Sequence, residues 1–596
     1  MINPIKDLYK YTLMFQSYLG KTIYVIFALG FFAAVFEGFG ILMMLPLLES
    51  LDGNSLPQAE GTINLIFLKI ISLSGLENST STILLVITFA FIVKGILAFG
   101  ALAVKSVLSG KLLRRFKGNL FDHYSEMTFD YYSTKDTGHF TNLINDQATR
   151  SLTAFDMLAT LGGQFINTLV LISLAFAITW QFGIMISFVG IFLLFIFMIL
   201  NKYVRELSRN TAFENGILTK WLIQTLQGYK YLSSTGQTHI LKKRIINSIS
   251  KLTNNQVGQA IASSFTQSVR EPITVVLIMM VVFIQLMIFD QKLAPILVSI
   301  VLFYRALNSV IAVQAAFQGT FMFIGSMEAV DNEFKNQKNN KIINGTKLLE
   351  DFHHGIELKN VSFRYNKRGE YQIRNVSFQC PALKSIALVG ISGAGKSTIA
   401  DMITLLKTSY EGEILIDNIE AKNIDRKSWQ NQIGYVSQET VIFNDTIANN
   451  ISMWSEIDNL SEELETSAAR ANILDFINSL ENGFETIVGD RGVLLSGGQK
   501  QRIFIARELF RKPKVLILDE ATSSLDSESE KEIQKSIESL KGEITLILIA
   551  HRLSTLKNVD FINVLDDGKI LESGTYEELM GNKNSKFRKL AALQTL

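Results

Sequence analysis

The sequence predicts two domains of different fold class: an all-α domain of six transmembrane helices with long cytoplasmic extensions, followed by an α/β domain. The chain has 596 residues, whereas a single hydrophobic core stops growing near about 250–300 residues. Charged residues make up only 19% of the chain and hydrophobic residues 48%. The long apolar runs end near residue 330. We therefore expect a transmembrane domain at 1–330, a linker at 331–354 and an α/β domain at 355–596.

Six apolar runs are long enough to cross a bilayer, which takes about 20 residues in a helix. They centre on residues 22–48, 82–104, 157–179, 182–201, 272–290 and 293–315. Only Trp180 and Gln181 separate the third run from the fourth. These two runs are therefore expected to form a hairpin, with an aromatic anchor at the membrane interface.

Basic residues indicate how the runs are oriented. They gather after the second and fourth runs, at Arg114, Arg115, Lys117, Arg205, Lys242, Lys243 and Arg244. The segment 49–81 contains a single basic residue, Lys69. Because cytoplasmic loops are enriched in Lys and Arg, both termini and the basic stretches are expected on the cytoplasmic side. Apolar residues at helical spacing predict that these stretches prolong the spans beyond the bilayer; amphipathic surface helices are the alternative.

Three ionisable residues, Glu37, Lys94 and Arg305, fall within apolar runs. A charge at the bilayer centre costs about 2.5–3.5 kcal/mol on insertion scales, so these side chains should face the interior of the bundle or a wet cavity. Glu37 and Arg305 are therefore candidate substrate-binding residues, and Lys94 is a weaker one. The structural alternative is that Glu37 forms an ion pair and that a Lys or Arg near a helix end extends to the interface.

The α/β domain contains a phosphate-binding loop. Residues 385–390 read as a buried strand, residues 390–397 match G-x-x-x-x-G-K-S, and a helical pattern follows. Glycines let successive backbone N–H groups turn toward a phosphate, and the helix N-terminus adds its positive dipole end. Lys396 is expected to reach the β- and γ-phosphates and Ser397 to bind Mg²⁺. The candidate nucleotide-binding residues of this loop are Gly390, Ser392, Gly393, Ala394, Gly395, Lys396, Ser397 and Thr398.

A second strand, residues 515–518, ends in Asp519 and Glu520. Carboxylates at the carboxyl end of a strand in this type of domain emerge beside the phosphate site. Asp519 is expected to hold Mg²⁺, directly or through water, and Glu520 to polarise the attacking water.

Composition and the remaining motifs exclude several classes of function. The net charge of +2 argues against a nucleic-acid partner. The single cysteine, Cys380, cannot form a disulfide within the chain. The histidines other than His551 have no metal-ligand spacing, so no metal beyond Mg²⁺ is expected. The N-terminus has no pattern typical of a removable signal peptide.

The sequence LSGGQ, at residues 495–499, is not required by any general folding rule. With it, residues 355–596 closely resemble the ATP-binding cassette (ABC) proteins. The further motifs of the resemblance, in family order, are Tyr365 ahead of the loop, Gln438 in YVSQ, Ser523 to Asp526 in SSLD and His551 in IAHR.

The resemblance implies a head-to-tail dimer in which each ATP lies between the phosphate loop of one chain and the signature loop of the other. On this basis Tyr365 stacks on adenine, Gln438 senses Mg²⁺ and the attacking water, Glu520 and His551 are catalytic, and Asp526 belongs to the nucleotide site. The signature residues expected to close over the γ-phosphate are Ser496, Gly497, Gly498 and Gln499. Glu520 and His551 match the active pattern, so a homodimer would have two competent sites.

The six spans and the fused C-terminal ATPase resemble ABC exporters, and the segment 488–492 resembles their x-loop, with Asp490 where many members have Glu. The short helices that couple the two domains are expected near Lys135 to Phe140 and near Gly216 to Trp221.

The resemblance implies an ATP-hydrolysing exporter or flippase in a bacterial cytoplasmic membrane. Its substrate would be amphipathic or lipid-linked. Residues 36–46 with Tyr304 and Arg305 look like the branch that flips lipid-linked oligosaccharides, and an Arg in a cavity could attract a pyrophosphate or carboxylate headgroup. Lipid A-type flippases, multidrug exporters and antimicrobial-peptide exporters stay open, as does a regulatory or channel-type ABC protein. The chain could also pair with a different partner as a heterodimer.

Overall fold

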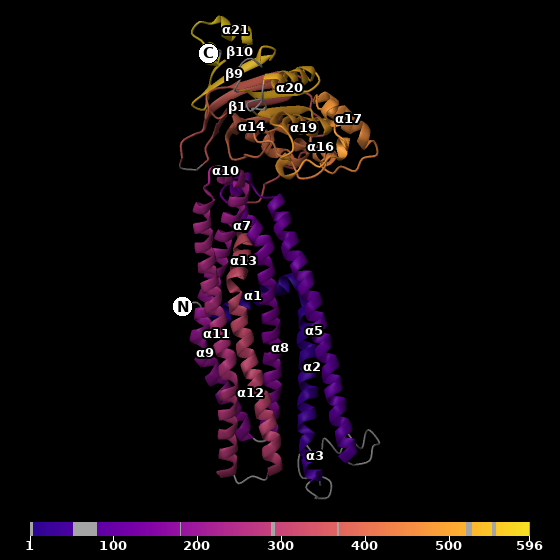
Figure 1. Ribbon diagram of the computed structural model, residues 1–596, viewed down its shortest axis with the longest axis vertical. Coiled ribbons are helices and arrows are strands. Elements are labelled where there is room, and N and C mark those ends of the chain that lie inside the picture. Colours follow the sequence, from indigo (N-terminus) through magenta and orange to yellow (C-terminus); the bar gives the residue numbers. More distant parts are fainter. Residues whose placement is uncertain are drawn as a thin grey trace. The chain divides into compact units, whose positions relative to one another are not determined.

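The computed structural model divides the chain into two compact units, which we call the helical unit and the α/β unit (Figure 1). The helical unit comprises Met1–Met127 and Tyr131–Lys341, and the α/β unit comprises Thr128–Asp130 and Ile342–Leu596. The structure describes residues 4–51, 80–178, 180–287, 293–365, 369–519, 527–550 and 556–594. The predicted fold class, a helical domain followed by an α/β domain, is confirmed.

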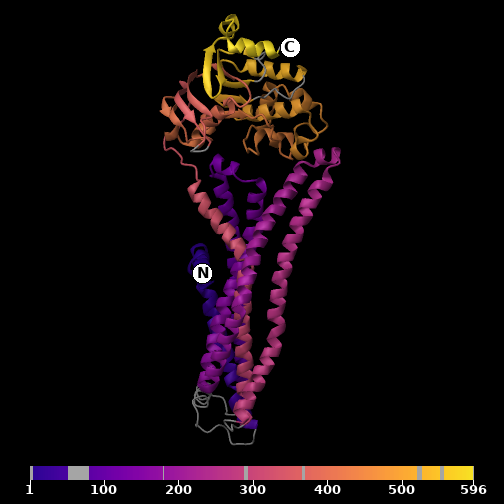
Figure 2. The same cartoon turned by 90° about the vertical axis from the view of Figure 1, so that its left-hand side faces the viewer.

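The helical unit is built almost wholly of helices, several of which are very long. Its helices are α1 (Pro4–Leu19), α2 (Ile23–Leu42), α3 (Met44–Leu51), α5 (Thr80–Ser125), α7 (Thr137–Asn142), α8 (Ala148–Ile178), α9 (Trp180–Gln227), α10 (Tyr229–Ser234), α11 (Thr238–Met287), α12 (Leu293–Met322) and α13 (Ile324–Asn339). The short helix α6 (Phe129–Ser133) begins in the segment assigned to the α/β unit and ends in the helical unit. Figure 2 shows the long helices of this unit running side by side.

Three of these helices are longer than a bilayer is thick. Helices α5, α9 and α11 contain 46, 48 and 50 residues, which corresponds to about 70 Å each at 1.5 Å per residue. The hydrocarbon core of a membrane is about 30 Å thick. These helices therefore extend well beyond a bilayer. This agrees with the prediction, made from apolar residues at helical spacing, that the basic stretches prolong the spans.

Four stretches of the described residues are long and apolar enough to span a membrane, namely Leu8–Leu48, Thr80–Ser125, Thr137–Phe176 and Ile300–Met322. They contain the first and second expected spans and overlap the third and sixth. The fourth lies within α9 and most of the fifth within α11, where several side chains are not described. The count of six spans stays a prediction.

The segments that connect the long helices only partly follow expectation. Helix α7 overlaps the first expected coupling segment, and the side chain of Asp136 caps it by accepting a hydrogen bond from the His139 N–H at 3.0 Å. The second placement, Gly216 to Trp221, is wrong, because these residues lie inside the continuous helix α9. That helix ends only at Gln227, and the short helix of this connection is α10.

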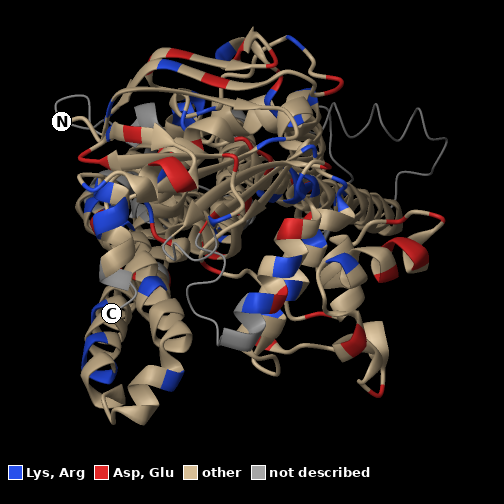
Figure 3. Cartoon of the chain, turned by 90° about the horizontal axis from the view of Figure 1, so that it is seen from above, with Lys and Arg blue, Asp and Glu red and all other residues tan. Residues whose placement is uncertain are grey.

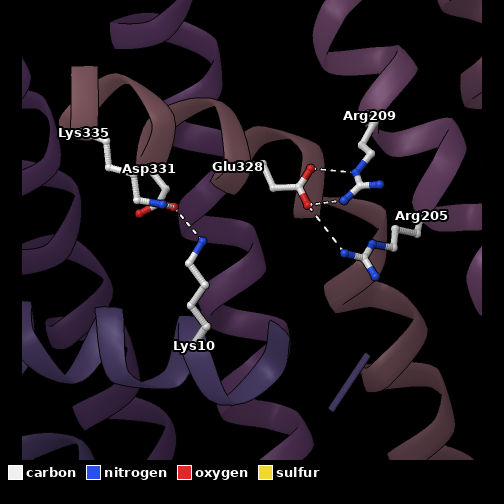
Figure 4. Close-up of polar contacts among 6 residues, drawn as sticks. All are labelled: Lys10, Arg205, Arg209, Glu328, Asp331 and Lys335. Atoms are coloured by element: carbon white, nitrogen blue, oxygen red, sulfur yellow. Dashed lines mark hydrogen bonds and ion pairs between the residues drawn. The ribbon is translucent and has the colours of Figure 1, made fainter. Parts of the chain in front are cut away.

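Helix α13 is held on two sides by ion pairs (Figure 4). Glu328 accepts two hydrogen bonds from Arg209 on α9, at 2.7 and 2.6 Å, and lies 3.6 Å from Arg205. Asp331 accepts hydrogen bonds from Lys10 of α1 and from Lys335, both at 2.7 Å. Because α13 continues to Asn339, the first part of the expected linker at 331–354 is helical and belongs to the helical unit.

The α/β unit alternates strands and helices. Its strands are β1 (Gly355–Phe363), β2 (Ile373–Pro381), β3 (Ser385–Val389), β4 (Glu411–Ile416), β5 (Ile419–Glu420), β6 (Ile433–Val436), β7 (Val515–Asp519), β8 (Thr545–Ala550), β9 (Phe561–Asp566) and β10 (Lys569–Gly574). Its helices are α14 (Lys396–Ile403), α15 (Arg426–Gln430), α16 (Ile447–Ser452), α17 (Leu460–Arg470), α18 (Leu474–Asn478), α19 (Gly497–Phe510), α20 (Ser527–Ser539), α21 (Tyr576–Gly581) and α22 (Lys586–Gln594).

Two sheets organise this unit. One is antiparallel in the order β2-β1-β4-β5, and the other has the order β10-β9-β3-β8-β7-β6. Strands β3, β7 and β8 pair in parallel at the centre of the larger sheet, and nearly every residue in them is buried. Parallel strands covered on both faces are continuously apolar, which explains why the sequence there does not alternate.

Charged residues are spread over the ribbon, and the single cysteine is buried. Seen from above, basic and acidic residues both occur over much of the ribbon (Figure 3). Cys380 is buried in β2, and burial raises the pKa of its thiol to about 12. A thiol that stays protonated is a poor nucleophile, so Cys380 is a packing residue.

Candidate functional site

The phosphate loop connects β3 to α14. Gly393 and Gly395 have positive φ angles of +82° and +100°, a region that residues with a Cβ rarely adopt. At Gly390, an added Cβ would lie 2.3 Å from the carbonyl oxygen of Leu565. The glycines of the motif are therefore required by the backbone geometry of this loop.

Lys396 begins α14 and lies over the loop. Its side chain is buried, and its Nζ donates hydrogen bonds to the carbonyl oxygens of Gly390 and Ile391 at 2.9 and 3.0 Å. Ser397 is exposed next to it, whereas Thr398 is buried. The loop thus combines one fixed positive charge with the N-terminus of a helix, an arrangement that binds phosphate.

The oxygen ligands expected for Mg²⁺ come from three elements. Asp519 ends β7 and is buried, Ser397 lies in the first turn of α14, and Gln438 is exposed after β6. Hydroxyl, carboxylate and amide oxygens are hard donors that suit Mg²⁺. The donor set therefore fits the ion.

Asp401 is a further acidic residue whose pKa responds to the charge of Asp519. Burial raises the pKa of Asp401 to about 6; Lys407 opposes this shift, and the charge of Asp519 adds to it.

Tyr365 presents an exposed ring ahead of the loop. The residue is 58% exposed, and its ring contacts Phe363 edge-to-face at 5.1 Å. The hydroxyls of Tyr365 and Thr398 lie 3.1 Å apart, which ties the ring to the helix of the phosphate loop. An exposed aromatic face in this position can stack on a base.

The signature residues cap a helix. Ser496 is the N-cap of α19: its Oγ accepts from the Gln499 N–H at 3.3 Å, and Gln499 Oε1 accepts from the Ser496 N–H at 2.8 Å. This reciprocal capping box satisfies two donors at the helix start. Ser496 and Gly497 are exposed and Gly498 is buried.

Three predicted site residues cannot be placed. Glu520, Asp526 and His551 lie outside the described residues. Their roles stay predictions.

The structure brings the three membrane charges together. Glu37 of α2 lies 2.9 Å from Lys94 Nζ of α5 and accepts a hydrogen bond from Arg305 Nη1 of α12 at 3.1 Å. The exposed side-chain fractions are 9% for Glu37, 28% for Lys94 and 45% for Arg305. Two cations and one anion give this cluster a formal net charge of +1.

The sequence analysis ranked Lys94 below Glu37 and Arg305, although Lys94 contacts Glu37 directly. It did not single out Arg507 or Tyr435 of the α/β unit. Arg507 of α19 is buried and donates hydrogen bonds to the carbonyl oxygens of Asn450 and Val441 at 2.6 and 2.7 Å. Tyr435 donates a hydrogen bond from its hydroxyl to Asp519 Oδ2 at 3.3 Å. The one sequence signal for Tyr435 was its place in the YVSQ motif.

Comparisons with known proteins agree with this geometry. Residues 23–309 match the ABC transporter transmembrane region, and residues 373–523 match the ABC transporter family. A solved structure described as that of a bacterial Atm1-family ABC exporter with ATP bound has a TM-score of 0.79 and 22% identity, covering 96% of this chain and 98% of that one. It shows the shared fold.

Curated relatives are similar over most of their length. The ATP-dependent lipid A-core flippase of Haemophilus influenzae (strain 86-028NP) is 32% identical over 521 residues, 85% of this chain and 87% of that protein. The proteins of the same name from Photobacterium profundum and Escherichia coli (strain K12) are also 32% identical, over 525 and 507 residues. They cover 85% and 84% of this chain, and 88% and 86% of their own lengths. The chain belongs to the ABC transporter family, as an integral membrane protein with an ATPase domain that drives translocation.

Proposed function

We propose that this protein is an exporter or flippase that moves an amphipathic, lipid-linked substrate with an anionic headgroup out of the inner leaflet by alternating access. The observation that carries the proposal is the excess positive charge of the Glu37–Lys94–Arg305 cluster among the membrane helices. An Arg or Lys binds a phosphate, pyrophosphate or carboxylate through charge-assisted hydrogen bonds, and ionisable residues within membrane spans commonly mark substrate pathways. The relatives named lipid A-core flippases support a lipid substrate.

The active unit in this proposal is a homodimer. The signature residues Ser496 and Gly497 are exposed at the start of α19. In the head-to-tail arrangement, this loop of one chain closes over the nucleotide on the phosphate loop of the other. Two identical chains would then form two competent ATP sites.

Within each site the proposed roles are as follows. Lys396 neutralises charge on the β- and γ-phosphates, the glycines of the loop let backbone N–H groups face them, and Tyr365 stacks on the adenine. Ser397, Asp519 and Gln438 hold Mg²⁺, which supplies further charge neutralisation when bound. Glu520 polarises the attacking water and His551 contacts the γ-phosphate. Asp526 completes the nucleotide site. Catalysis is then a matter of position and electrostatics.

The proposed location is a bacterial cytoplasmic membrane with six spans. Both termini and the α/β unit are on the cytoplasmic side, because basic residues follow the second and fourth spans. A multidrug or antimicrobial-peptide exporter is the alternative function. A regulatory or channel-type protein agrees less well with the hydrolytically active motif pattern, in which Glu520 and His551 are both present.

The test is substrate stimulation of ATP hydrolysis in liposomes. The panel comprises polyprenyl-linked glycans, lipid A, cationic peptides and hydrophobic drugs. We expect an anionic lipid-linked compound to stimulate hydrolysis, Arg305→Ala to weaken this stimulation about tenfold or more, and the charge-preserving Arg305→Lys to retain most of it. Stimulation by drugs or peptides alone, or stimulation by the lipid that survives Arg305→Ala unchanged, would contradict the proposal.

A further inference from the structure

Tyr435 lies on the edge strand of the larger sheet, beside the strand that ends in the Mg²⁺ carboxylate. Strand β6 is the last in the order of that sheet and pairs with β7, and Tyr435 is in register with Ile517, two residues before Asp519. The Tyr435 hydroxyl donates its hydrogen bond to Asp519 Oδ2 at 3.3 Å. A phenol from one strand therefore contacts the carboxylate at the end of the next.

The backbone of Tyr435 is anchored by the helix that carries the signature. Its N–H donates to Oε2 of Glu508 at 3.2 Å, and Glu508 is buried on α19. Gly434 allows this approach, because a Cβ there would lie 2.8 Å from Leu516 Cδ1 and 3.3 Å from Glu508 Cβ. Helix α19, Glu508, Tyr435 and Asp519 thus form one continuous chain of contacts.

The chemistry of the phenol suits a fixed donor. A phenol has an ordinary pKa of about 10, so the Tyr435 hydroxyl keeps its proton at neutral pH. A donor on one carboxylate oxygen restricts the rotation of the carboxylate. Partners of this kind orient metal ligands and commonly tune metal affinity.

We propose that Tyr435 is a positioning residue for magnesium: its hydroxyl holds the Asp519 carboxylate in the orientation that meets the Mg²⁺ of the bound nucleotide. This inference rests on the proposed nucleotide site. The same contacts connect the Mg²⁺ ligand Asp519 to α19, the helix that begins at the signature. A movement of α19 would therefore reach the Asp519 carboxylate through Glu508 and Tyr435.

The test uses the full-length protein in nanodiscs and the variant Tyr435→Phe, which removes only the hydroxyl. Mn²⁺ replaces Mg²⁺ as a paramagnetic probe, and its binding in the presence of a non-hydrolysable ATP analogue is measured by electron paramagnetic resonance. We expect the Mn²⁺ dissociation constant, and the Mg²⁺ concentration for half-maximal hydrolysis, to rise about three- to tenfold, as for the loss of one ordinary hydrogen bond. Binding of the analogue without metal should not change.

The matched control is Tyr410→Phe. Tyr410 is buried in the α/β unit, where Tyr435 is half-buried, but among the described residues the Tyr410 hydroxyl has no hydrogen-bond partner. This variant should match the wild type in metal affinity and in metal-free binding.

A Mn²⁺ affinity of Tyr435→Phe within twofold of the wild type would overturn the inference. So would an equal loss of metal-free nucleotide binding, which would indicate a merely structural role. If the wild type itself bound the analogue without any dependence on metal, the proposed nucleotide site would be wrong instead.

Discussion

The phosphate loop and the Glu37–Lys94–Arg305 cluster both concentrate positive charge, but they use different groups to do so. The loop relies on one lysine, a helix N-terminus and backbone set by glycines with positive φ. The cluster relies on three side chains from α2, α5 and α12, two of them partly exposed. The loop is therefore rigid and suited to one ligand, whereas the cluster can rearrange around headgroups of different shape.

The largest expected effect is at the nucleotide site. Glu520→Gln should lower steady-state ATP hydrolysis about 10²- to 10⁴-fold, the usual contribution of a general base, and leave ATP binding intact. Hydrolysis by purified protein and binding of a fluorescent ATP analogue measure the two. The control is Glu543→Gln, since the Glu543 side chain forms an exposed ion pair with Arg470. Unchanged turnover in Glu520→Gln would disprove the assigned role.

A smaller effect tests whether the loop depends on its backbone. Gly395→Ala should lower ATP affinity about tenfold, because its φ of +100° would shift and misplace N–H donors to a charged phosphate. Gly542→Ala is the matched control, with φ of +82° and open space around the position. Gly542→Ala should destabilise the protein by about 1–2 kcal/mol through left-handed backbone strain. Gly395→Ala should cost more, because its Cβ would also lie 2.4 Å from Ile373 Cδ1. Equal ATP affinity in both variants would contradict this reading.

The smallest effect concerns ion pairs inside and outside the membrane spans. Glu37→Gln leaves two cations without their anion, and we expect it to destabilise the helical unit by about 1–3 kcal/mol, less than a fully buried pair because Arg305 is half exposed. Glu328→Gln is the counterpart, since Glu328 also lies between two cations, Arg205 and Arg209, but on α13, after the last candidate span among the described residues. It should cost less than about 1 kcal/mol.

Thermal unfolding at low and high salt separates these two variants. Salt ions reach an ion pair outside the membrane more readily than one within it, so the effect of Glu328→Gln should fade at high salt and that of Glu37→Gln should persist. Identical salt dependence would mean that salt screens the Glu37–Lys94–Arg305 cluster as strongly as the Glu328 pairs.

The same contrast explains what the sequence could predict. Every group of the phosphate loop lies within nine consecutive residues, from Gly390 to Thr398, so the motif and its strand–loop–helix context predict the site. The pairing of Glu37 with Lys94 and Arg305 depends on how three helices far apart in sequence pack. The presence of three charged residues in apolar runs was predictable, but the ion pair of Lys94 with Glu37 was not.

Two further features needed the fold. The contact of Tyr435 with Asp519 follows from the register of β6 with β7, which no spacing rule supplies. The second coupling segment was misplaced because nothing in residues 216–221 distinguishes the middle of a helix from its end; α9 stops only before Gly228. Local motifs were reliable, and helix ends were not.

The Glu37–Lys94 pair also bears on biogenesis. A lone charge is costly to insert at the bilayer centre, yet α2 and α5 follow each other closely in the chain and their opposite charges lie 2.9 Å apart. Inserted as a pair, they neutralise each other early in synthesis. Arg305 emerges from the ribosome 268 residues after Glu37 and enters beside an acid that is already in place. Translation order thus places Glu37, the single acid of the cluster, ahead of both cations.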